Sequence, residues 1–470
     1  MSATVVAPPA FGDGKADCIY FLMYDSWPWE MRSNRWHYAS RWARHLPVVL
    51  VQPVLMKDDE PSVSLPEPRI PNARILKVRA AYPPICSLTT GMLQAKQLHE
   101  DMAAHGYSRP ILWTYNPDYL FASEILPASM RVFHATENYF YFERLTKGFI
   151  ERLKRLLAIS DLVIGVSEGV VASHRPFAKD VATAVTNGCD FAFYNTRERD
   201  ATVVRLGEGW EKTAVYAGNI NNRLDFELLD AAAAANPTTN FVFFGPISGI
   251  ADTSDAERWK LLVSRKNVSY QGAVDVEQLP GIFAAAHVGL IPYKSDPILV
   301  DNTFPLKAFE MQSAGLPVVS TDLSALRTEA GPGLLIASGR DAFIDGVRRL
   351  DRRVLGDNDQ LIMRQKCLEH DYDRKFDAVF ELVTSHLKRD LGISAPGLEL
   401  RGLASAMQSS EELARLYAPI APNAPRQVSI HSPLAKWVSR IEEKTINGVR
   451  SKVPRPFKSI LKKILKVSPP

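Results

Sequence analysis

The chain is poor in cysteine and has no long apolar run, and each absence excludes a class of protein. Only four cysteines occur in 470 residues, too far apart for a clustered metal site or a disulfide scaffold, which favours a reducing compartment. No stretch approaches the roughly 20 apolar residues of a membrane span. The apolar run Cys18–Tyr24 follows Asp13, Lys15 and Asp17 instead of the basic start of a signal peptide. We therefore expect neither a secreted nor an integral membrane protein.

The charges are divided unequally along the chain. The net charge is +4, but Arg426–Pro470 holds 11 Lys and Arg against Glu442 and Glu443, which is +9 and leaves −5 for the rest. A body that binds nucleic acid would need a basic groove. The mildly acidic body therefore predicts no nucleic-acid partner.

Short apolar, β-rich runs alternate with helical patterns, which is typical of βαβ units with parallel sheets. The runs are Cys18–Tyr24, Pro47–Gln52, Ile75–Val78, Ile111–Trp113, Arg131–His134, Leu162–Val166 and Ala182–Val185, then Ala214–Ala217, Phe241–Phe244, Val268–Tyr270, Val288–Pro292, Pro317–Ser320 and Leu334–Ile336. The rhythm breaks at the charged segment Asn195–Gly209. We therefore expect an α/β protein with two doubly wound, Rossmann-like domains at residues 1–200 and 210–390.

Beyond the second domain the composition changes. Residues 391–433 are rich in proline and predict a linker, and residues 434–470 form a basic amphipathic tail. Within the tail, residues 457–467 carry an apolar stripe opposite four lysines. This pattern predicts a helix that lies on an anionic membrane surface. The alternative is that the stripe docks on the protein's own body or on a partner.

The stretch Asp301–Thr321 predicts a loop, a helix, a tight turn and a strand. We expect Asn302 or Thr303 to cap the helix, Pro305 to lie in its first turn and Gly315 to end it.

Lys307 and Glu310 would share one face near the start of this helix. A cation there opposes the helix dipole unless an anion such as a phosphate joins it. A carboxylate there can accept hydrogen bonds from a ribose diol. A surface Lys–Glu pair is the equally weighted alternative.

The pattern Pro305-x-Lys307-x-x-Glu310-x-x-x-x-Gly315-x-Pro317 resembles the donor-site motif of bacterial two-Rossmann-domain (GT-B) glycosyltransferases. The likeness covers roughly residues 15–385 and includes Thr186–Asp190, Tyr216–Asp225, Phe244–Pro246 and Val288–Tyr293. The protein is similar to the retaining glycosyltransferase family 4 and, more loosely, to the inverting xanthan glucuronosyltransferase. Family 4 usually has an acidic residue where this sequence has Asn302, so the stereochemical outcome stays open.

The resemblance implies a nucleotide-sugar site in the second domain. Gly218 and Asn219 follow a strand and precede a helix, where a glycine lets a ligand approach the backbone. Arg223 could pair with the diphosphate, which the resemblance places near this loop, or be a solvated arginine at a helix start. Tyr293 either stacks on the base or packs in the core.

In the first domain, His134 and Glu137 come at the carboxyl end of a predicted strand, where ligands of doubly wound sheets collect. We favour Glu137 as the general base and His134 as the residue that orients the donor sugar. In many family 4 enzymes a histidine falls near His134, so the roles could be reversed. The other alternative is a core histidine and a surface glutamate.

Trp29, Arg32 and Arg35 follow the first strand and are candidates for the acceptor side. Aromatic rings suit sugar faces and arginines suit anionic acceptors such as a lipid diphosphate. An equally weighted alternative is that neighbouring tryptophans pack and the arginines are solvated.

Together these features predict a glycosyltransferase that moves a sugar from a nucleotide diphosphate donor to a glycan or lipid-linked acceptor in surface polysaccharide synthesis. We expect no metal or other cofactor, since no Asp-x-Asp lies in a loop where a cation would be expected. We expect the protein in the cytoplasm, peripheral on the inner face of the cell membrane. The alternatives are a nucleotide-sugar epimerase on the same scaffold and a catalytically silent nucleotide-binding partner of a membrane glycosylation complex.

Overall fold

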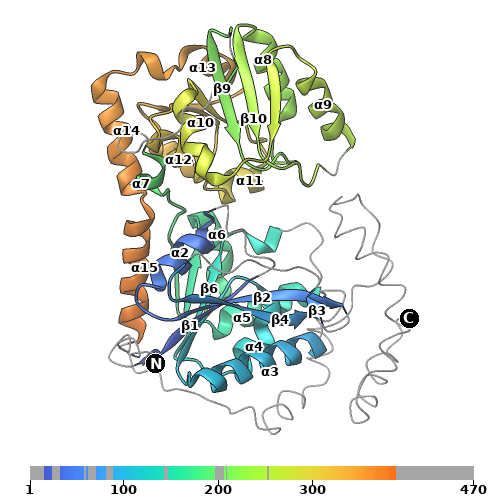
Figure 1. Ribbon diagram of the computed structural model, residues 1–470, viewed down its shortest axis with the longest axis vertical. Coiled ribbons are helices and arrows are strands. Elements are labelled where there is room, and N and C mark those ends of the chain that lie inside the picture. The colour runs from blue at the N-terminus through green and yellow to red at the C-terminus, as the bar shows by residue number, and fades with distance from the viewer. Residues whose placement is uncertain are drawn as a thin grey trace, which may run out of the picture.

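The computed structural model shows two α/β domains that follow one another along the long axis of the molecule (Figure 1). It describes residues 15–23, 32–57, 60–61, 70–80, 88–141, 147–195, 206–207, 209–250 and 253–387. The predicted linker 391–433, the predicted tail 434–470 and the candidate acceptor residue Trp29 lie outside the described residues.

The first domain is built on a sheet with the strand order β3-β2-β1-β5-β6-β7-β8, in which β4 also pairs with β2. All of its pairings are parallel except that of β2 with β3. The strands are β1 (Cys18–Leu22), β2 (Val48–Lys57), β3 (Glu60–Pro61), β4 (Ala73–Ala80), β5 (Pro110–Thr114), β6 (Met130–Ala135), β7 (Leu162–Gly165) and β8 (Val181–Ala184).

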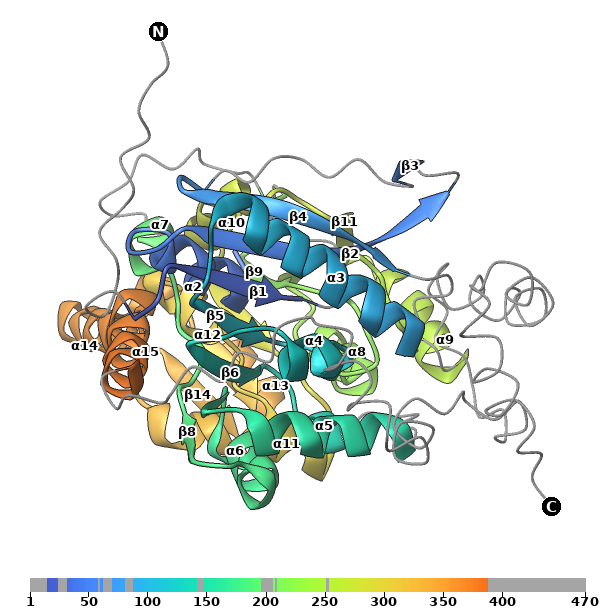
Figure 2. The same ribbon diagram turned by 90° about the horizontal axis from the view of Figure 1, so that it is seen from below.

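Helices cover both faces of this sheet, with α3, α4 and α5 on one side and α2 and α15 on the other (Figure 2). Successive residues of β1 alternate between the two cores, because side chains of a strand point to opposite faces. The helices are α2 (Asn34–Trp42), α3 (Leu88–His105), α4 (Leu120–Ile125), α5 (Lys147–Ile159), α6 (Glu168–His174) and α7 (Phe191–Tyr194), the last in the connection to the second domain.

The second domain has an entirely parallel sheet with the order β11-β10-β9-β12-β13-β14. Its strands are β9 (Lys212–Ala217), β10 (Thr239–Phe244), β11 (Val268–Gly272), β12 (Val288–Ile291), β13 (Val318–Thr321) and β14 (Leu334–Ala337). Its helices are α8 (Phe226–Ala235), α9 (Thr253–Val263), α10 (Leu279–Ala285), α11 (Pro297–Asn302), α12 (Lys307–Ser313), α13 (Arg340–Arg349) and α14 (Asp357–Glu369). The strand order reverses between β9 and β12, the place where ligands of such sheets bind.

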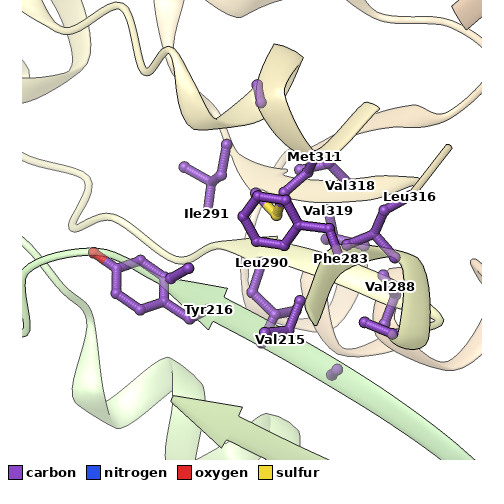
Figure 3. Close-up of a cluster of buried hydrophobic side chains, with 14 of the residues drawn as sticks. Val215, Tyr216, Phe283, Val288, Leu290, Ile291, Met311, Leu316, Val318 and Val319 are labelled. Atoms are coloured by element: carbon purple, nitrogen blue, oxygen red, sulfur yellow. The ribbon is translucent and has the colours of Figure 1, made fainter. Parts of the chain in front are cut away.

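The core of this domain fixes α12 against the sheet. Met311 of α12 packs with Val215, Leu290 and Val319 from three neighbouring strands (Figure 3). A Cβ atom at Gly289 would lie 2.3 Å from the Met311 sulfur, so only glycine lets the helix come this close to β12. The position of α12 is therefore set by buried contacts one turn beyond Lys307.

The predicted fold class is confirmed, and each predicted strand overlaps a strand of the structure. The predicted start of the helix after Asp301 is wrong. Asn302 is the last residue of α11, where the amide of its side chain donates to the Ile298 carbonyl oxygen, and α12 begins only at Lys307 with Leu306 as its N-cap. Asp296 caps α11 instead, with Pro297 in its first turn.

The last helix that the structure describes, α15 (Tyr372–Leu387), returns to the first domain and packs beside its sheet (Figure 1). Its apolar residues join the core cluster that contains Tyr38 and Trp42, and Asp373 accepts a hydrogen bond from Arg41 at 2.8 Å. Residues 210–390, taken from the sequence as one domain, thus end in a helix that belongs by packing to the first domain.

Candidate functional site

Lys307, the first residue of α12, lies between two tyrosines of neighbouring strand ends. Its Nζ atom donates to the Tyr293 hydroxyl at 3.0 Å and lies 5.3 Å from the centroid of the Tyr216 ring. Burial lowers the pKa of Lys307, but Tyr216, Tyr293 and Glu310 outweigh it, so the pKa is raised overall. The ammonium is therefore a fixed positive charge at the start of a helix.

The Gly218 loop lies directly against this ammonium. A Cβ atom at Gly218, whose φ is +149°, would lie 2.9 Å from Lys307 Nζ. The Gly218 amide donates to the Phe244 carbonyl oxygen at 2.9 Å, so this amide is already used, while Asn219 is exposed. On the other side, a Cβ at Gly245 would meet the Gly218 carbonyl oxygen at 2.0 Å. Gly245 must be glycine for the two loops to approach each other, and Gly218 leaves room for the Lys307 ammonium.

Glu310 lies one turn after Lys307 and is only 8% exposed. The Tyr194 hydroxyl hydrogen-bonds its carboxylate. Burial raises the pKa of Glu310 to about 7, against the opposing effects of Lys307 and of the bond from Tyr194. The alternative of a surface Lys–Glu pair does not describe this arrangement, because the carboxylate is buried.

Arg223 and Glu137 meet across the two domains. Arg223 Nη2 donates to both carboxylate oxygens of Glu137, at 2.9 and 2.8 Å. Both side chains are about two-fifths exposed. Burial lowers the pKa of Arg223, but the Glu137 carboxylate outweighs it and raises the pKa overall. The structure thus pairs Glu137, the candidate base of the first domain, with Arg223, the residue of the second domain expected to bind the diphosphate.

A second interdomain contact lies next to the first. Asn138 Nδ2 donates to Asn302 Oδ1 at 2.7 Å. On α6, a Cβ atom at Gly169 would lie 2.4 Å from the Asp301 carbonyl oxygen. The segment after β6 and the start of α6 therefore touch α11 closely, and Asn302 contacts the first domain at this point.

His134 is a residue of β6 and Glu137 comes just after that strand, but their side chains lie in different places. Its ring is fully buried among Tyr38, Trp113 and Tyr115, with centroid separations of 4.9, 5.7 and 5.1 Å. Neither ring nitrogen has a hydrogen-bond partner among the described residues. Burial lowers the pKa of His134 to about 3, so the ring is neutral. This is the arrangement of a core histidine, and a role in orienting the sugar stays a prediction.

The candidate acceptor residues Arg32 and Arg35 are both half-buried. Arg32 Nη1 lies 2.5 Å from Asp190 Oδ2, and its guanidinium carbon lies 3.6 Å from the Phe193 ring centroid. Arg32 is therefore bound to the connection between the domains, which differs from the solvated arginine of the alternative interpretation. Arg35 lies in the first turn of α2.

Sequence reasoning missed Tyr194 and Asn138. The only signal for Tyr194 was its place four residues after Asp190, which caps α7 by accepting from the Phe193 amide. Asn138 could have been noticed as the neighbour of Glu137.

Among the described residues, no group of three or more His, Cys, Asp and Glu side chains could hold a metal ion. Within that same part of the protein, no helix has both the length and the apolar character that crossing a membrane requires.

Comparison with known sequences finds a family match within the second domain. Residues 211–352 match the family described as Glycosyl transferases group 1. The putative teichuronic acid biosynthesis glycosyltransferase TuaH of Bacillus subtilis is 30% identical over 176 residues, which are 37% of this chain and 42% of that protein. The O-antigen chain mannosyltransferase B of Escherichia coli is 25% identical over 215 residues, 44% of this chain and 54% of that protein. The match thus spans about half the length of these relatives.

Comparison with solved structures covers both domains. The Anabaena protein HepE, solved in complex with UDP and glucose, aligns with 78% of this chain and 100% of its own, with a TM-score of 0.53 and 14% identity. Other neighbours cover similar shares of the protein. The match to Glycosyl transferases group 1 thus falls on the second domain, and the protein as a whole has the two-Rossmann-domain (GT-B) fold of these solved structures.

Proposed function

We propose that the protein is a glycosyltransferase that moves a sugar from a nucleoside diphosphate donor to a glycan or lipid-linked acceptor in bacterial surface polysaccharide synthesis. The observation that carries the proposal is the pair Lys307 and Glu310 at the start of α12, beside the Gly218 loop at the point where the strand order reverses. The two relatives are named for teichuronic acid and O-antigen, both polysaccharides, which supports the same class of product.

In this proposal the donor is bound by the second domain. Lys307, together with Arg223, neutralises the diphosphate, and Glu310 accepts hydrogen bonds from the ribose diol. Gly218 and Asn219 form the loop that the diphosphate approaches, and Tyr293 supports Lys307 through its hydroxyl. Two cations and a helix start provide the stabilisation of the leaving group, so the proposal includes no resident metal or other cofactor.

Glu137 is the proposed general base. In the structure its carboxylate is held by Arg223. A donor diphosphate carries more negative charge than one carboxylate and would compete for Arg223, which frees Glu137. The free carboxylate would take the proton of the acceptor hydroxyl while that oxygen bonds to the sugar anomeric carbon, and the bond to the diphosphate breaks. The nucleoside diphosphate leaves with the electron pair of that bond.

Asn302 bears on the outcome at the anomeric carbon. It offers a neutral amide where a carboxylate is usual in the retaining family, and it is bound to Asn138 of the first domain. Glu137 as base fits an inverting displacement, in which an acceptor activated by a base attacks directly. We therefore propose that Asn302 has a role in domain contact and donor placement instead of a charged one.

The proposed test incubates the protein with a panel of nucleotide sugars, with and without lipid-linked acceptors, and follows the products by mass spectrometry. The proposal expects a glycosylated acceptor and a nucleoside diphosphate, and a turnover about 10²–10⁴-fold lower for Glu137→Gln. A changed sugar without any acceptor would show an epimerase. Nucleotide binding without turnover for the whole panel would show a silent binding partner.

The proposal also places the protein in the cytoplasm, on the inner face of the membrane, through residues 457–467. An apolar stripe with lysines opposite suits an interfacial helix, and a lipid-linked acceptor would be confined to that surface. Co-sedimentation with anionic and neutral vesicles compares the full-length protein with one that ends at Pro454. Equal binding of both proteins, or binding indifferent to lipid charge, would remove the membrane assignment.

A further inference from the structure

The donor-site carboxylate Glu310 has a partner that comes from neither α12 nor its sheet. Tyr194, the last residue of α7, hydrogen-bonds Glu310 through its hydroxyl and is 1% exposed. Its ring stacks on Phe283 of α10 with the centroids 5.8 Å apart. α7 lies in the connection between the domains, so the orientation of Glu310 depends on where this connection is held.

The start of α7 is held both by Asp371, whose Oδ2 accepts from the Phe191 amide at 3.0 Å, and by the first domain. Asp190 Oδ1 accepts from the Phe193 amide at 3.4 Å, which caps the helix, and Asp190 Oδ2 lies 2.5 Å from Arg32 Nη1. The side chains of Arg32 and Asp190 are only 22% and 16% exposed. Arg32 also covers the ring of Phe193 and has a φ of +40°, an unfavourable conformation for a residue with a side chain. The ion pair and the ring contact therefore fix Arg32 on α7 and its cap.

We propose that Arg32 and Tyr194 are positioning residues for Glu310. Arg32, from the first domain, neutralises Asp190 and anchors the start of α7, and Tyr194 at the end of α7 holds the Glu310 carboxylate for the ribose diol. The inference rests on the proposed donor site. It adds a way for the first domain to set the charge and the orientation of the Glu310 carboxylate in the second domain.

The charges around Glu310 predict the direction in which its pKa changes when Arg32 or Asp190 is replaced. Lys307 from its own helix and the hydroxyl of Tyr194 favour the carboxylate, whereas Asp190 from α7 disfavours it. The Glu310 carboxylate is also among the causes that raise the pKa of Tyr372 of α15, after burial. If Arg32 neutralises Asp190, then its removal exposes Glu310 to more negative charge and makes the carboxylate harder to ionise. Removal of the Asp190 charge does the opposite.

The test measures nucleotide affinity by calorimetry from about pH 5.5 to about pH 8.5, a range that brackets the pKa of a buried carboxyl group. UDP, GDP and ADP are compared first, and the tightest ligand is used. Because the diol is bound by a carboxylate, affinity for the wild type should fall on acidification with a midpoint near the Glu310 pKa of about 7. The 2′-deoxy form of the same nucleotide should show a smaller pH dependence.

Four variants distinguish positioning of Glu310 from a general loosening of the structure. Arg32→Gln and Tyr194→Phe should each raise the midpoint by about half a pH unit or more, and Asp190→Asn should lower it, since asparagine still caps α7. Arg32→Lys is the conservative control and should keep the midpoint near that of the wild type.

Two results would overturn the proposal. The first is a midpoint that does not move in Tyr194→Phe and Asp190→Asn, the two variants that keep the shape of the side chain and are least exposed to loss of folding. The second is a shift of Arg32→Gln and Asp190→Asn in the same direction, as a loosened structure would give. If the wild type binds no nucleoside diphosphate at any pH, the proposed donor site itself fails, and the positioning proposal fails with it.

Discussion

At the scale of single residues, the proposed donor site is a set of buried and half-buried charges that support one another. Lys307 is placed by two tyrosines, and Glu310 by a third. Burial of a lone charge is unfavourable, and the fold offsets that effect with aromatic rings and hydroxyl groups. The arrangement is suited to a ligand that carries both phosphate and hydroxyl groups.

The first prediction concerns these two charges. Lys307→Met and Glu310→Gln should each weaken nucleoside diphosphate binding by about 1.5–3 kcal/mol, because each removes a hydrogen bond to a charged group. Calorimetry measures the loss, and Lys260→Met, at an exposed lysine of α9, is the matched control. Unchanged affinity in both site variants would leave Lys307 and Glu310 with a structural role only.

The second prediction concerns His134 and acid. Its pKa is lowered from 6.5 in the unfolded protein to about 3 in the fold, so the unfolded state binds the extra proton first. The resulting loss of stability begins as the pH falls below about 6.5 and grows until about 3. Between pH 7 and pH 5 the free energy of unfolding should therefore fall less for His134→Phe than for the wild type. The two losses should differ by up to about 2 kcal/mol.

Urea unfolding of both proteins at the two pH values measures this difference. His37 and His174 also have lowered pKa values because of burial, so the wild type and the variant share the rest of the acid effect. An equal loss in both proteins would mean that His134 is protonated in the fold and has a partner.

At the scale of helices and strands, local sequence patterns predicted which strands and helices form better than they predicted what those elements pack against. Runs such as Phe241–Phe244 are short, apolar and bounded by turns, so the strands were found from the sequence. The start of α12 was missed because Asn302 and Thr303 are good capping residues, whereas Asp296 before Pro297 formed a stronger start six residues earlier. Nothing in a single amphipathic stripe shows which domain it packs on, so the return of α15 could not be foreseen.

The third prediction concerns the carboxyl end of α13, which a buried lysine caps. Lys212 of β9 donates to the carbonyl oxygens of Val347 at 2.6 Å, of Arg348 at 3.2 Å and of Leu350. These groups have no further helical partner, so the Lys212 ammonium caps the carboxyl end of the helix from another element. Lys212→Met should lower the free energy of unfolding by about 1–3 kcal/mol, because it leaves carbonyl groups unpaired.

Thermal and urea unfolding check this effect. Lys260→Met, an exposed lysine of α9, is the control for loss of a positive charge. Equal stability of Lys212→Met and the wild type would show that water or a backbone shift satisfies the carbonyl groups.

At the scale of the whole molecule, the two domains touch through a few polar contacts that involve the candidate site itself. Glu137 binds Arg223, and Asn138 binds Asn302. From the sequence, Glu137 and Arg223 were separate candidates with separate roles. Their pairing could not be predicted, because they are 86 positions apart in the sequence and belong to different domains, so only the relative placement of the domains brings them together.

The fourth prediction follows from this pairing and concerns how the donor competes with Glu137. Both side chains are partly exposed, so the ion pair contributes about 0–1 kcal/mol, which corresponds to at most about a fivefold change in affinity. Glu137→Gln frees Arg223 and should bind a nucleoside diphosphate slightly more tightly. Arg223→Gln removes a cation from the site and should bind it more weakly.

The most direct measurement of the central claim is the calorimetric dissociation constant of a nucleoside diphosphate for the wild type, Glu137→Gln and Arg223→Gln at one pH and low salt. If the diphosphate takes the place of the Glu137 carboxylate on Arg223, the two variants must change affinity in opposite directions. Two variants that both bind as the wild type does, or that both bind more weakly, would contradict a donor site built on Arg223.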